Sequence, residues 1–571
     1  MRVTNGMMRT NSMLNMQRNK VMYDKYLQQY NTQKKIQRPS DDPTIAVRAL
    51  KYRTTLTEIE QYKRNIDDAT SWMDATETAL KDVDAVMDNM VQYVTQAATG
   101  TVNAKDRADI NKQLDQFAQY IYEQDLNSDY AGRYIFTGYR TDSALLFDKA
   151  QDNVQYTIHE QLDVSDIRKY DYVYGRAEIG DTKSAADYAG EAPQFLSTNR
   201  ILVSYQDLVD YAVDDGHGGT IIDTSGFTTN FEKLKDDGTQ EALNVTQKNA
   251  SADGKTAAAD TTVSSITGPY ITYKDKDGNE FIKQVKIKRV ADDETGTPPG
   301  KYNEHLKPED YDVYLVPETG ELVFGDKVYD EIRGGSDLSI TYQKKSFDKN
   351  DIKPEHYFVC EAVDDNGVVS RYNTNKANIG DNELFNNYTP APQEIQYQIN
   401  FSQTIQVNTE GYKAVGAVTG RSIEDIKNSC NELDVIEIRM SEVEKRLGDL
   451  DAEKDKKKIA DLTELKTQLQ TQMDLQKSVL VKSLGAMITT IQKAKDKINV
   501  ALADHGSRYN RMSMTEKKID ELQIDTEQAK SDNEDADLGE AYINFTESNL
   551  LYQATLNATS KVLGQSLLDF I

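Results

Sequence analysis

A heptad pattern of apolar residues dominates residues 45–97. Every seventh position from Ile45 is apolar, and a second, partly apolar row runs three residues further on. The first row consists of Ile45, Tyr52, Ile59, Ile66, Met73, Leu80, Met87 and Val94. Such a repeat predicts a long helix that packs against other helices. At 1.5 Å per residue the helix would be about 80 Å long, so we expect it in a rod rather than in a compact globule.

The hexapeptide RPSDDP begins at Arg38 and lies directly before this region. Pro39 is expected to end a preceding helix, because a proline disfavours helical geometry in the residue before it. Asp42 is a good N-cap, and Pro43 fits the first helical position, where its missing N–H costs nothing. Asp41 and Asp42 also lie near the positive end of the helix dipole. We interpret the hexapeptide as a sharp joint between two helices, although a helix start signal alone would explain the same residues.

Both ends of the chain carry further apolar seams at helical spacing. The N-terminal seam consists of Met16, Tyr23, Leu27 and Tyr30. The last helix is expected to start at SDNEDAD, where Ser531 and Glu534 have the spacing of a capping box. Its seams contain Leu538, Tyr542, Phe545, Tyr552, Leu556, Leu563 and Phe570. We expect the helices from opposite ends to pair, because each carries an apolar stripe and has no local partner.

The middle of the chain loses the helical period. Alternating runs such as FIKQVKIKRV, separated by turn signals such as DKDGNE and PETGE, predict a β-rich insert of one or two domains. Helical period returns near Ile426, and residues 428–480 are interpreted as an added antiparallel helical hairpin.

The predicted fold class is therefore α+β and multidomain, with a helical coiled-coil rod built from both chain ends. The predicted parts are an N-terminal assembly helix (1–40), the N-terminal half of the rod (41–141), the β-rich outer part (142–400), the C-terminal half of the rod (401–530) and a C-terminal assembly helix (531–571).

Charge narrows the possible partners. The chain carries 94 acidic and 67 basic residues, a formal net charge of -27. Such a surface repels nucleic acid and anionic membranes, so neither is expected as a partner. The sequence contains no run of 18 apolar residues, so no membrane span is predicted. The N-terminus also lacks the apolar core of a signal peptide. Residues 1–40 are basic by contrast, with eight Lys or Arg and one acid, Asp24.

The sequence contains no convincing set of catalytic or metal-binding residues. Cys360 and Cys430 lie far apart and form no zinc-binding spacing, so two unpaired thiols are expected, with one disulfide as the alternative. HEQLD lacks the second histidine of a zinc protease motif, and DKDGNE places Lys286 where a calcium loop needs glutamate. No phosphate-binding loop or nucleophile elbow occurs. We therefore predict no enzyme activity, no metal and no cofactor.

Six segments resemble bacterial flagellins and the hook-associated proteins related to them. They are MRVTNGMM at the start, RPSDDP, GRYIFTGYRT at 132–141, INFSQTIQVNTEG at 399–411, GSRYNR at 506–511, and the terminal segment from EDADLGEAYINF onward. The resemblance covers residues 1–141 and 399–571, and its specificity lies in the order of the segments at the two ends of the chain. Residues 428–480 look longer than the corresponding region of the family.

The resemblance implies a structural protein of the flagellum rather than an enzyme. It implies a ring of self-associated subunits that joins the hook to the filament, and an extracellular location reached by flagellar type III export without a cleaved signal peptide. The implied partners are a hook-associated protein on the hook side, flagellin or capping-side subunits on the filament side, and an export chaperone at the C-terminal helix. A filament subunit and an unrelated coiled-coil surface adhesin are the alternatives.

Overall fold

The structure is a computed structural model that describes residues 5–98, 103–174, 183–190, 192–214, 220–234, 240–289, 307–335, 337–374, 389–417, 420–451 and 453–568. It divides into two compact units. Unit 1 consists of Met1–Ser71, Gln396–Gln406 and Ser507–Ile571, and unit 2 of Trp72–Ile395 and Val407–Gly506. Two long helices, α2 and α9, contribute residues to both units.

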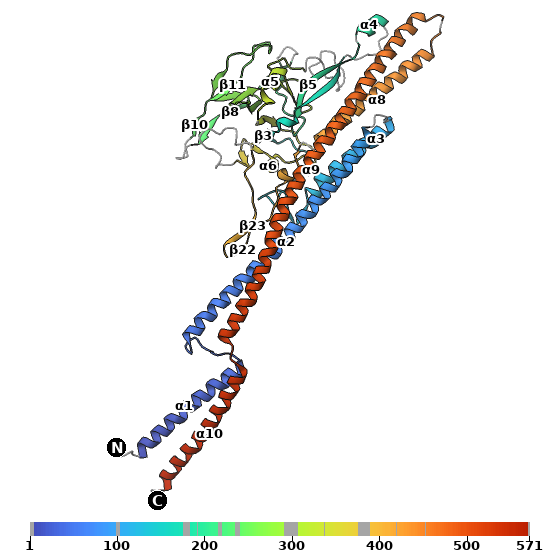
Figure 1. Cartoon of the computed structure of the whole chain (residues 1–571). Coiled ribbons are helices and arrows are strands. Elements are labelled where there is room, and N and C mark those ends of the chain that lie inside the picture. Colours follow the sequence, from blue (N-terminus) through green and yellow to red (C-terminus); the bar gives the residue numbers. More distant parts are fainter. Residues whose placement is uncertain are drawn as a thin grey trace. The chain divides into compact units, whose positions relative to one another are not determined.

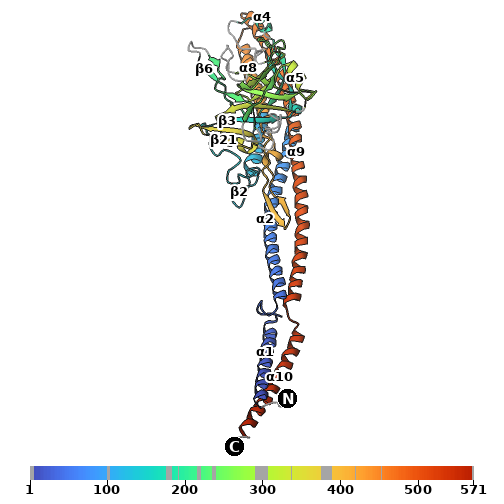
Figure 2. The same cartoon turned by 90° about the vertical axis from the view of Figure 1, so that its left-hand side faces the viewer.

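Unit 1 is helical apart from one hairpin. Its helices are α1 (Asn5–Thr32), α10 (Leu538–Leu568), the start of α2 (Pro43–Ala97) and the end of α9 (Lys456–Glu534). The hairpin consists of β22 (Gln396–Asn400) and β23 (Gln403–Gln406). The terminal helices α1 and α10 lie side by side in both views (Figures 1 and 2). The chain ends therefore pair, as the two seams predict.

The predicted long helix is present as α2, which has 55 residues. The six rod-core positions are each at most 1% exposed; Ile59 and Ile66 belong to unit 1, and Met73, Leu80, Met87 and Val94 to unit 2. In unit 1, Lys63 of α2 forms an ion pair of 2.6 Å with Asp520 of α9. The seven-residue apolar repeat thus buries one face of α2 from Ile59 to Val94, while its first two positions, Ile45 and Tyr52, are half-buried.

Unit 2 contains two main sheets. The eight-stranded sheet has the order β12 (Thr261–Val263), β11 (Val245–Gln247), β15 (Glu280–Gln284), β14 (Tyr270–Lys274), β19 (Leu338–Lys344), β3 (Val154–Leu162), β20 (Val359–Asp364), β21 (Val369–Tyr372). The five-stranded sheet has the order β16 (Lys286–Ile287), β17 (Val313–Val316), β18 (Glu321–Phe324), β5 (Gln194–Leu202), β4 (Arg168–Tyr174). A β-rich centre between helical ends is thus shown.

Smaller elements complete unit 2. Four strand pairs accompany the sheets: β1 (Asp129–Tyr130) with β2 (Arg133–Tyr134), β6 (Ala212–Asp214) with β7 (Thr220–Ile222), β8 (Thr228–Asn230) with β13 (Ser265–Thr267), and β9 (Glu232–Leu234) with β10 (Gln240–Ala242). The helices are α3 (Ala104–Gln119), the π-helix η1 (Tyr120–Asp125), the 3-10 helix η2 (Val164–Asp166), α4 (Ala185–Gly190), α5 (Asp326–Ile332), α6 (Pro354–Tyr357), α7 (Gly411–Ala414) and α8 (Arg421–Gly448).

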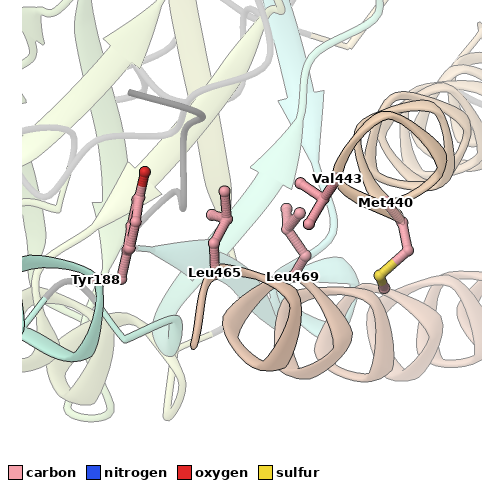
Figure 3. Close-up of a cluster of buried hydrophobic side chains, with 5 residues drawn as sticks. All are labelled: Tyr188, Met440, Val443, Leu465 and Leu469. Carbon is pink, nitrogen blue, oxygen red and sulfur yellow. The ribbon is translucent and has the colours of Figure 1, made fainter. Parts of the chain in front are cut away.

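Helix α8 and the start of α9 form the helical hairpin of the region 428–480. Its core is a cluster shown in Figure 3, with Met440 and Val443 from α8, Leu465 and Leu469 from α9, and Tyr188 from α4. An ion pair of 2.8 Å between Glu444 and Lys466 joins the same two helices. Beyond the hairpin α9 continues without a break to Glu534, so a single helix of 79 residues leads from unit 2 into unit 1.

Candidate assembly surface

Aromatic side chains from the two chain ends meet between α1 and α10. The ring centroids of Tyr23 and Phe545 are 5.6 Å apart, and those of Tyr23 and Tyr552 are 5.8 Å apart. Tyr30 contacts Tyr542 and Phe545 at 5.8 and 5.9 Å. Aromatic pairs at these separations add to the free energy of apolar burial. The structure thus brings together Tyr23, Tyr30 and part of the predicted C-terminal seam; Met16 and Leu27 are half-buried.

The buried face of α10 differs from the predicted seam. Its most buried side chains are small: Ala541, Ser548 and Thr559 are 4%, 4% and 3% exposed. Leu556 was expected on the seam between the terminal helices, but it is 46% exposed. The reason is that Thr555, its neighbour, faces α1 and accepts a hydrogen bond of 2.6 Å from Asn19 Nδ2.

Large apolar side chains of both terminal helices are left exposed. On α10 these are Leu538, Tyr542, Ile543, Leu550, Leu551 and Leu556, each at least 46% exposed. On α1 they include Met7, Met8, Met13, Leu14, Val21 and Met22, each at least 45% exposed. We call these residues the outer apolar face. The side chain of Leu563 and all of Phe570 lie outside the described residues. Exposed apolar side chains in this number are typical of surfaces that bind other proteins.

The RPSDDP segment forms a compact turn before α2. Asp42 Oδ1 accepts hydrogen bonds from the amides of Thr44 and Ile45, at 2.9 and 3.2 Å. Pro43 is the first residue of α2. Asp41 Oδ2 accepts from the amides of Arg38 and Gln37, at 2.9 and 3.1 Å, and these two bonds lower the pKa of the exposed Asp41 carboxyl. Both aspartates therefore fix the backbone of the joint.

Helix α1 ends earlier than the proline predicts, at Thr32 rather than next to Pro39. Gln33 has a left-handed φ of 57°. The next residues pair with the start of the connection between α9 and α10: the amide of Lys35 donates to the carbonyl of Glu534 at 2.7 Å, and the amide of Ala536 donates to the carbonyl of Gln33 at 2.9 Å. This pairing between distant segments, rather than a local signal, ends the helix.

A cluster of charges surrounds the same crossing point. The buried carboxylate of Glu534 accepts hydrogen bonds from Arg53 Nε and Nη2, at 3.1 and 2.8 Å. Lys34 Nζ lies 3.6 Å from Glu534 and also pairs with Asp535. Burial alone would raise the pKa of Glu534, but the hydrogen bond and charge of Arg53, helped by Lys34, lower it below its usual value. The carboxylate is therefore held ionised.

The structure corrects the predicted start of the last helix. The capping-box spacing of Ser531 and Glu534 predicted a start at Ser531, but both residues belong to the end of α9 and α10 begins at Leu538. Asp537 is the residue that caps α10, since its Oδ1 accepts from the amides of Gly539 and Glu540 at 2.7 and 3.3 Å. Glu534 instead bonds to Arg53, a residue from a distant helix that local spacing cannot reveal.

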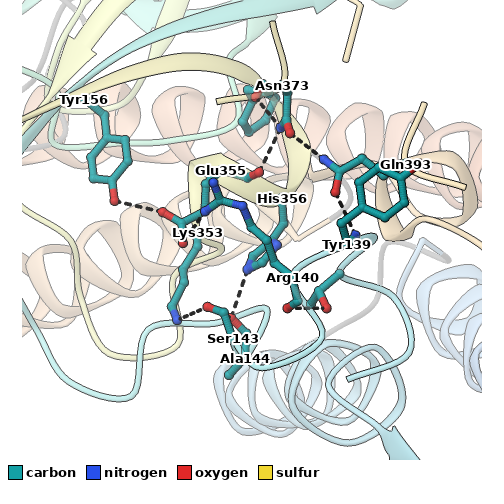
Figure 4. Close-up of polar contacts among 12 residues, drawn as sticks. Tyr139, Arg140, Ser143, Ala144, Tyr156, Lys353, Glu355, His356, Asn373 and Gln393 are labelled. Atoms are coloured by element: carbon teal, nitrogen blue, oxygen red, sulfur yellow. Dashed lines mark hydrogen bonds and ion pairs between the residues drawn. The ribbon is translucent and has the colours of Figure 1, made fainter. Parts of the chain in front are cut away.

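The segment 132–141 is anchored in unit 2 by a polar network (Figure 4). Arg140 lies 3.5 Å from Glu355 and 4.2 Å from the centre of the Tyr372 ring. Gln393 accepts from the amide of Tyr139 at 2.9 Å. A Cβ atom on Gly138, which has φ 65°, would lie only 2.4 Å from Gln393 Oε1, so glycine is required there. The partners were not identified from the sequence, because they lie more than 200 residues away.

No set of catalytic or metal-binding groups emerges from the described part of the chain. Within the described ranges, no group of three His, Cys, Asp or Glu side chains is placed to hold a metal ion. None of the described helices combines the length and the apolar character needed to cross a membrane. Cys360 and Cys430 are both buried free thiols, so the alternative of a disulfide between them is wrong.

Comparison with known protein families matches both ends of the chain. The model of the bacterial flagellin N-terminal helical region matches residues 3–141, and the model of the C-terminal helical region matches residues 488–571. Both models thus cover the elements that form the terminal helix pair and the joint.

Two curated relatives are flagellar hook-associated protein 3 from Escherichia coli (strain K12) and from Salmonella typhimurium. The first is 28% identical over 144 residues, 25% of this chain and 45% of the relative; the second is 29% identical over 150 residues, 26% of this chain and 47% of the relative. The match thus spans about half the length of these relatives.

Solved structures of similar proteins include a putative flagellar hook-associated protein from Vibrio parahaemolyticus, with 29% identity, a TM-score of 0.18, and coverage of 19% of this chain and 49% of that one. FlgL from Xanthomonas campestris has 12% identity and a TM-score of 0.28, with coverage of 84% and 99%. Such TM-scores support no conclusion about the arrangement of the chain.

Proposed function

Since this chain carries both helical regions of the flagellin family, we propose that it is the structural adaptor that joins hook to filament in a bacterial flagellum. The observation that carries the proposal is the outer apolar face of α1 and α10. The terminal helices pair through small and aromatic side chains, and they leave leucines such as Leu550 and Leu551 at 63% and 54% exposure. The similarity to hook-associated protein 3 favours an adaptor over other members of the family.

The outer apolar face supplies a driving force for assembly. Burying one large apolar side chain contributes roughly 1.5–3 kcal/mol relative to leaving it exposed. Six such side chains on α10 and six on α1 therefore give a free energy well above that needed for a specific contact, even after the cost of association. Copies of this chain are proposed to bury these faces against each other in a ring of subunits.

The proposed neighbours follow from the position of an adaptor. A hook-associated protein would contact the ring on the hook side, and flagellin or capping-side subunits would contact it on the filament side. Before assembly, an export chaperone would cover the apolar side of α10, because an uncovered apolar stripe promotes aggregation. The mature site of action would be extracellular, on the flagellum.

Deleting the gene tests the adaptor against the filament subunit. Loss of an adaptor should leave hooks without filaments while flagellin is released into the medium. Bare hooks without released flagellin would indicate a filament subunit instead, and normal filaments would refute both. An unrelated adhesin would leave the flagellum intact.

Complementation of that deletion with point variants tests the assembly surface. Leu551→Asp and Leu556→Asp place a charge on the outer apolar face, and each should abolish filament formation. Asn557→Asp adds the same charge at an exposed position of the same helix and serves as the matched control, which should restore filaments. Restoration by Leu551→Asp would contradict the role of this face. Circular dichroism of the purified variants checks that the β-rich insert stays folded.

A further inference from the structure

A cavity of about 580 Å³ lies within unit 2, between strands β3, β4 and β5 and helix α9. Its apolar lining includes Leu162, Ile201, Phe358 and Val479. Helix α9 contributes small side chains at Ala486 and Ala494, which leave the space open. A volume of this size lies within the range of ordinary small-molecule sites, roughly 300–1,000 Å³.

Most charged groups in the cavity wall already have partners. Arg200 pairs with Asp425 at 2.8 Å and stacks on the ring of Tyr170, with 3.4 Å from its guanidinium carbon to the ring centre. Lys493 pairs with Asp166 at 2.6 Å, and Lys482 forms an ion pair with Asp171. The pair of Lys482 with Asp171 joins α9 to β4. The paired charges neutralise one another and need no ligand.

Arg168 of β4 differs from these paired groups. Its Nη1 donates to the carbonyl of Ala486 at 2.9 Å, and its Nη2 donates to Thr490 Oγ1 at 2.5 Å. Both acceptors are neutral; the carboxylates of Asp166 and Asp425 act on Arg168 only through their charge, without a direct ion pair among the described residues. Burial lowers the pKa of this guanidinium, which nevertheless stays charged at any ordinary pH. Its five N–H groups provide further donors beyond these two bonds.

One buried polar group of the cavity wall lacks a partner. The Tyr357 hydroxyl makes no hydrogen bond within the described residues, and Tyr357 is only 4% exposed. Ser483, which is 7% exposed, also lines the cavity and interacts with Tyr170. A buried hydroxyl without a partner costs free energy, so a ligand that bonds to it gains affinity. The cavity therefore combines an apolar wall, a guanidinium that bonds only to neutral acceptors and one hydroxyl without a partner.

We propose that this cavity binds a small organic carboxylate with an apolar body. The carboxylate would accept paired hydrogen bonds from Arg168, because a guanidinium matches the two oxygens of a carboxylate. The apolar body would lie against Ile201 and Val479, and the Tyr357 hydroxyl would bond to a polar edge of the ligand. Such a ligand replaces neutral acceptors with a charged, paired one at Arg168, which a neutral molecule of the same shape does not do.

The test compares two probes of the same shape, 2-naphthoate and its neutral isostere 2-naphthamide, by titration calorimetry on the full chain. We expect saturable binding of naphthoate with one site per chain, at least tenfold tighter than binding of naphthamide. Arg168→Gln should weaken naphthoate binding at least tenfold and remove the preference over naphthamide. Arg333→Gln removes the same charge from an exposed residue outside the cavity and should bind like the wild type.

A second variant locates the bound probe even if Arg168→Gln fails to fold. Ser483→Cys places a thiol in the cavity wall, while the native thiols of Cys360 and Cys430 are buried. Saturating naphthoate should slow alkylation of the new thiol by iodoacetamide at least fivefold, whereas naphthamide at the same concentration should not. Equal affinity for the two probes, wild-type binding by Arg168→Gln, or alkylation unaffected by naphthoate would each overturn the proposal. Neither measurement depends on the flagellar assignment.

Discussion

Tyr23 of α1 and Phe545 of α10 bring the two ends of the chain into contact, with their ring centroids 5.6 Å apart. Few large side chains share this contact, because most of the leucines and methionines of both helices face outward. The pairing of α1 with α10 is therefore weaker than the number of their apolar residues suggests. These exposed apolar residues contribute free energy only when another molecule covers them.

The first prediction concerns the order of the terminal helices in the free subunit. Ordering a backbone costs about 1–2 kcal/mol per residue, and the narrow contact around Tyr23 returns little of it. In the monomer we expect amides of α1 and α10 to exchange hydrogen within seconds, while amides of β3 exchange slowly. Hydrogen exchange with mass spectrometry measures both in one sample. Slow exchange at Tyr23 and Leu556 in a verified monomer would contradict the prediction.

The second prediction concerns the buried carboxylate at the joint. Glu534→Gln keeps the shape of the side chain but removes the charge that faces Arg53 and Lys34. Because both cations are partly exposed, we expect unit 1 to lose about 1–2 kcal/mol of stability at pH 7. The folded pKa of Glu534 is lowered, so this contribution exists above the unfolded pKa and is lost as the pH falls through the folded value.

The measurement is urea unfolding followed by far-ultraviolet circular dichroism at pH 7 and pH 3. The single tryptophan, Trp72, belongs to unit 2, so its fluorescence reports that unit separately. Glu547→Gln, an exposed carboxylate on α10, is the control and should change little. An equal loss for Glu534→Gln at both pH values would show that charge is not the cause.

The third prediction concerns the helical hairpin of α8 and α9. Leu469 is completely buried in the cluster of Figure 3, so Leu469→Ala removes apolar contacts and leaves a cavity. We expect a loss of about 2–5 kcal/mol in the unfolding of unit 2. The adjacent Gln470→Ala, which changes an exposed side chain, should stay within about 0.5 kcal/mol. A stable Leu469→Ala variant in urea unfolding would show that the hairpin does not need this cluster.

The fourth prediction is a loss of stability in mild acid caused by His356. Its Nε2 lies 3.2 Å from the carbonyl of Ala144, and burial, with the charges of Lys353 and Arg140, lowers its pKa to about 4 (Figure 4). Below pH 6.5 the unfolded chain therefore binds a proton that the folded chain does not, and folding weakens until about pH 4.

The cost is about 1.4 kcal/mol for each pH unit in that window. His356→Gln removes the titration, so its stability should fall less than that of the wild type between pH 6.5 and pH 4.5. The control is His305→Gln, which makes the same substitution at a histidine outside the described residues. Parallel curves of stability against pH for His356→Gln and the wild type would contradict the assignment.

The fifth prediction has the opposite sign and concerns Asp125, at the end of the π-helix η1. Burial, followed by the charge of Asp82, raises the pKa of Asp125 to about 7, and its Oδ2 has no partner among the described residues. A raised carboxyl pKa contributes stability below the unfolded value, and this contribution is lost as the pH rises to about 7. Asp125→Asn should therefore stabilise unit 2 by about 1–3 kcal/mol at pH 8 and by little at pH 4.

Thermal unfolding followed by Trp72 fluorescence at both pH values measures this difference. Asp109→Asn, an exposed residue of α3, is the matched control. A gain for Asp125→Asn that is equal at pH 4 and pH 8 would exclude a role for the ionised carboxyl.

Regular repetition explains why the rod core could be predicted. In α2 one apolar residue every seven positions places Ile59, Ile66 and Met73 on one buried face, and no information from distant residues is needed. The burial of α10 could not be predicted in this way. There Ser548 and Thr559 are buried while Leu556 is exposed, because the facing helix approaches the small side chains.

Contacts between distant segments account for the remaining differences. Strand β3 pairs on one side with β19 and on the other with β20, and Ile158 thus faces Tyr342 and Cys360. Alternation of apolar residues identifies such strands but not their neighbours. Arg168 was likewise not recognised in the sequence, since its neutral acceptors lie on α9, more than 300 residues away.

The backbone pairing of Lys34 with Asp535 has a mechanical consequence. The two hydrogen bonds at this bridge, together with the ion pairs to Glu534, cross-link the chain where α1 leads into α2 and α9 leads into α10. A pull applied to one terminal helix alone is therefore shared between both long helices. In the flagellar adaptor proposed above, this cross-link would keep either long helix from bearing such a load alone.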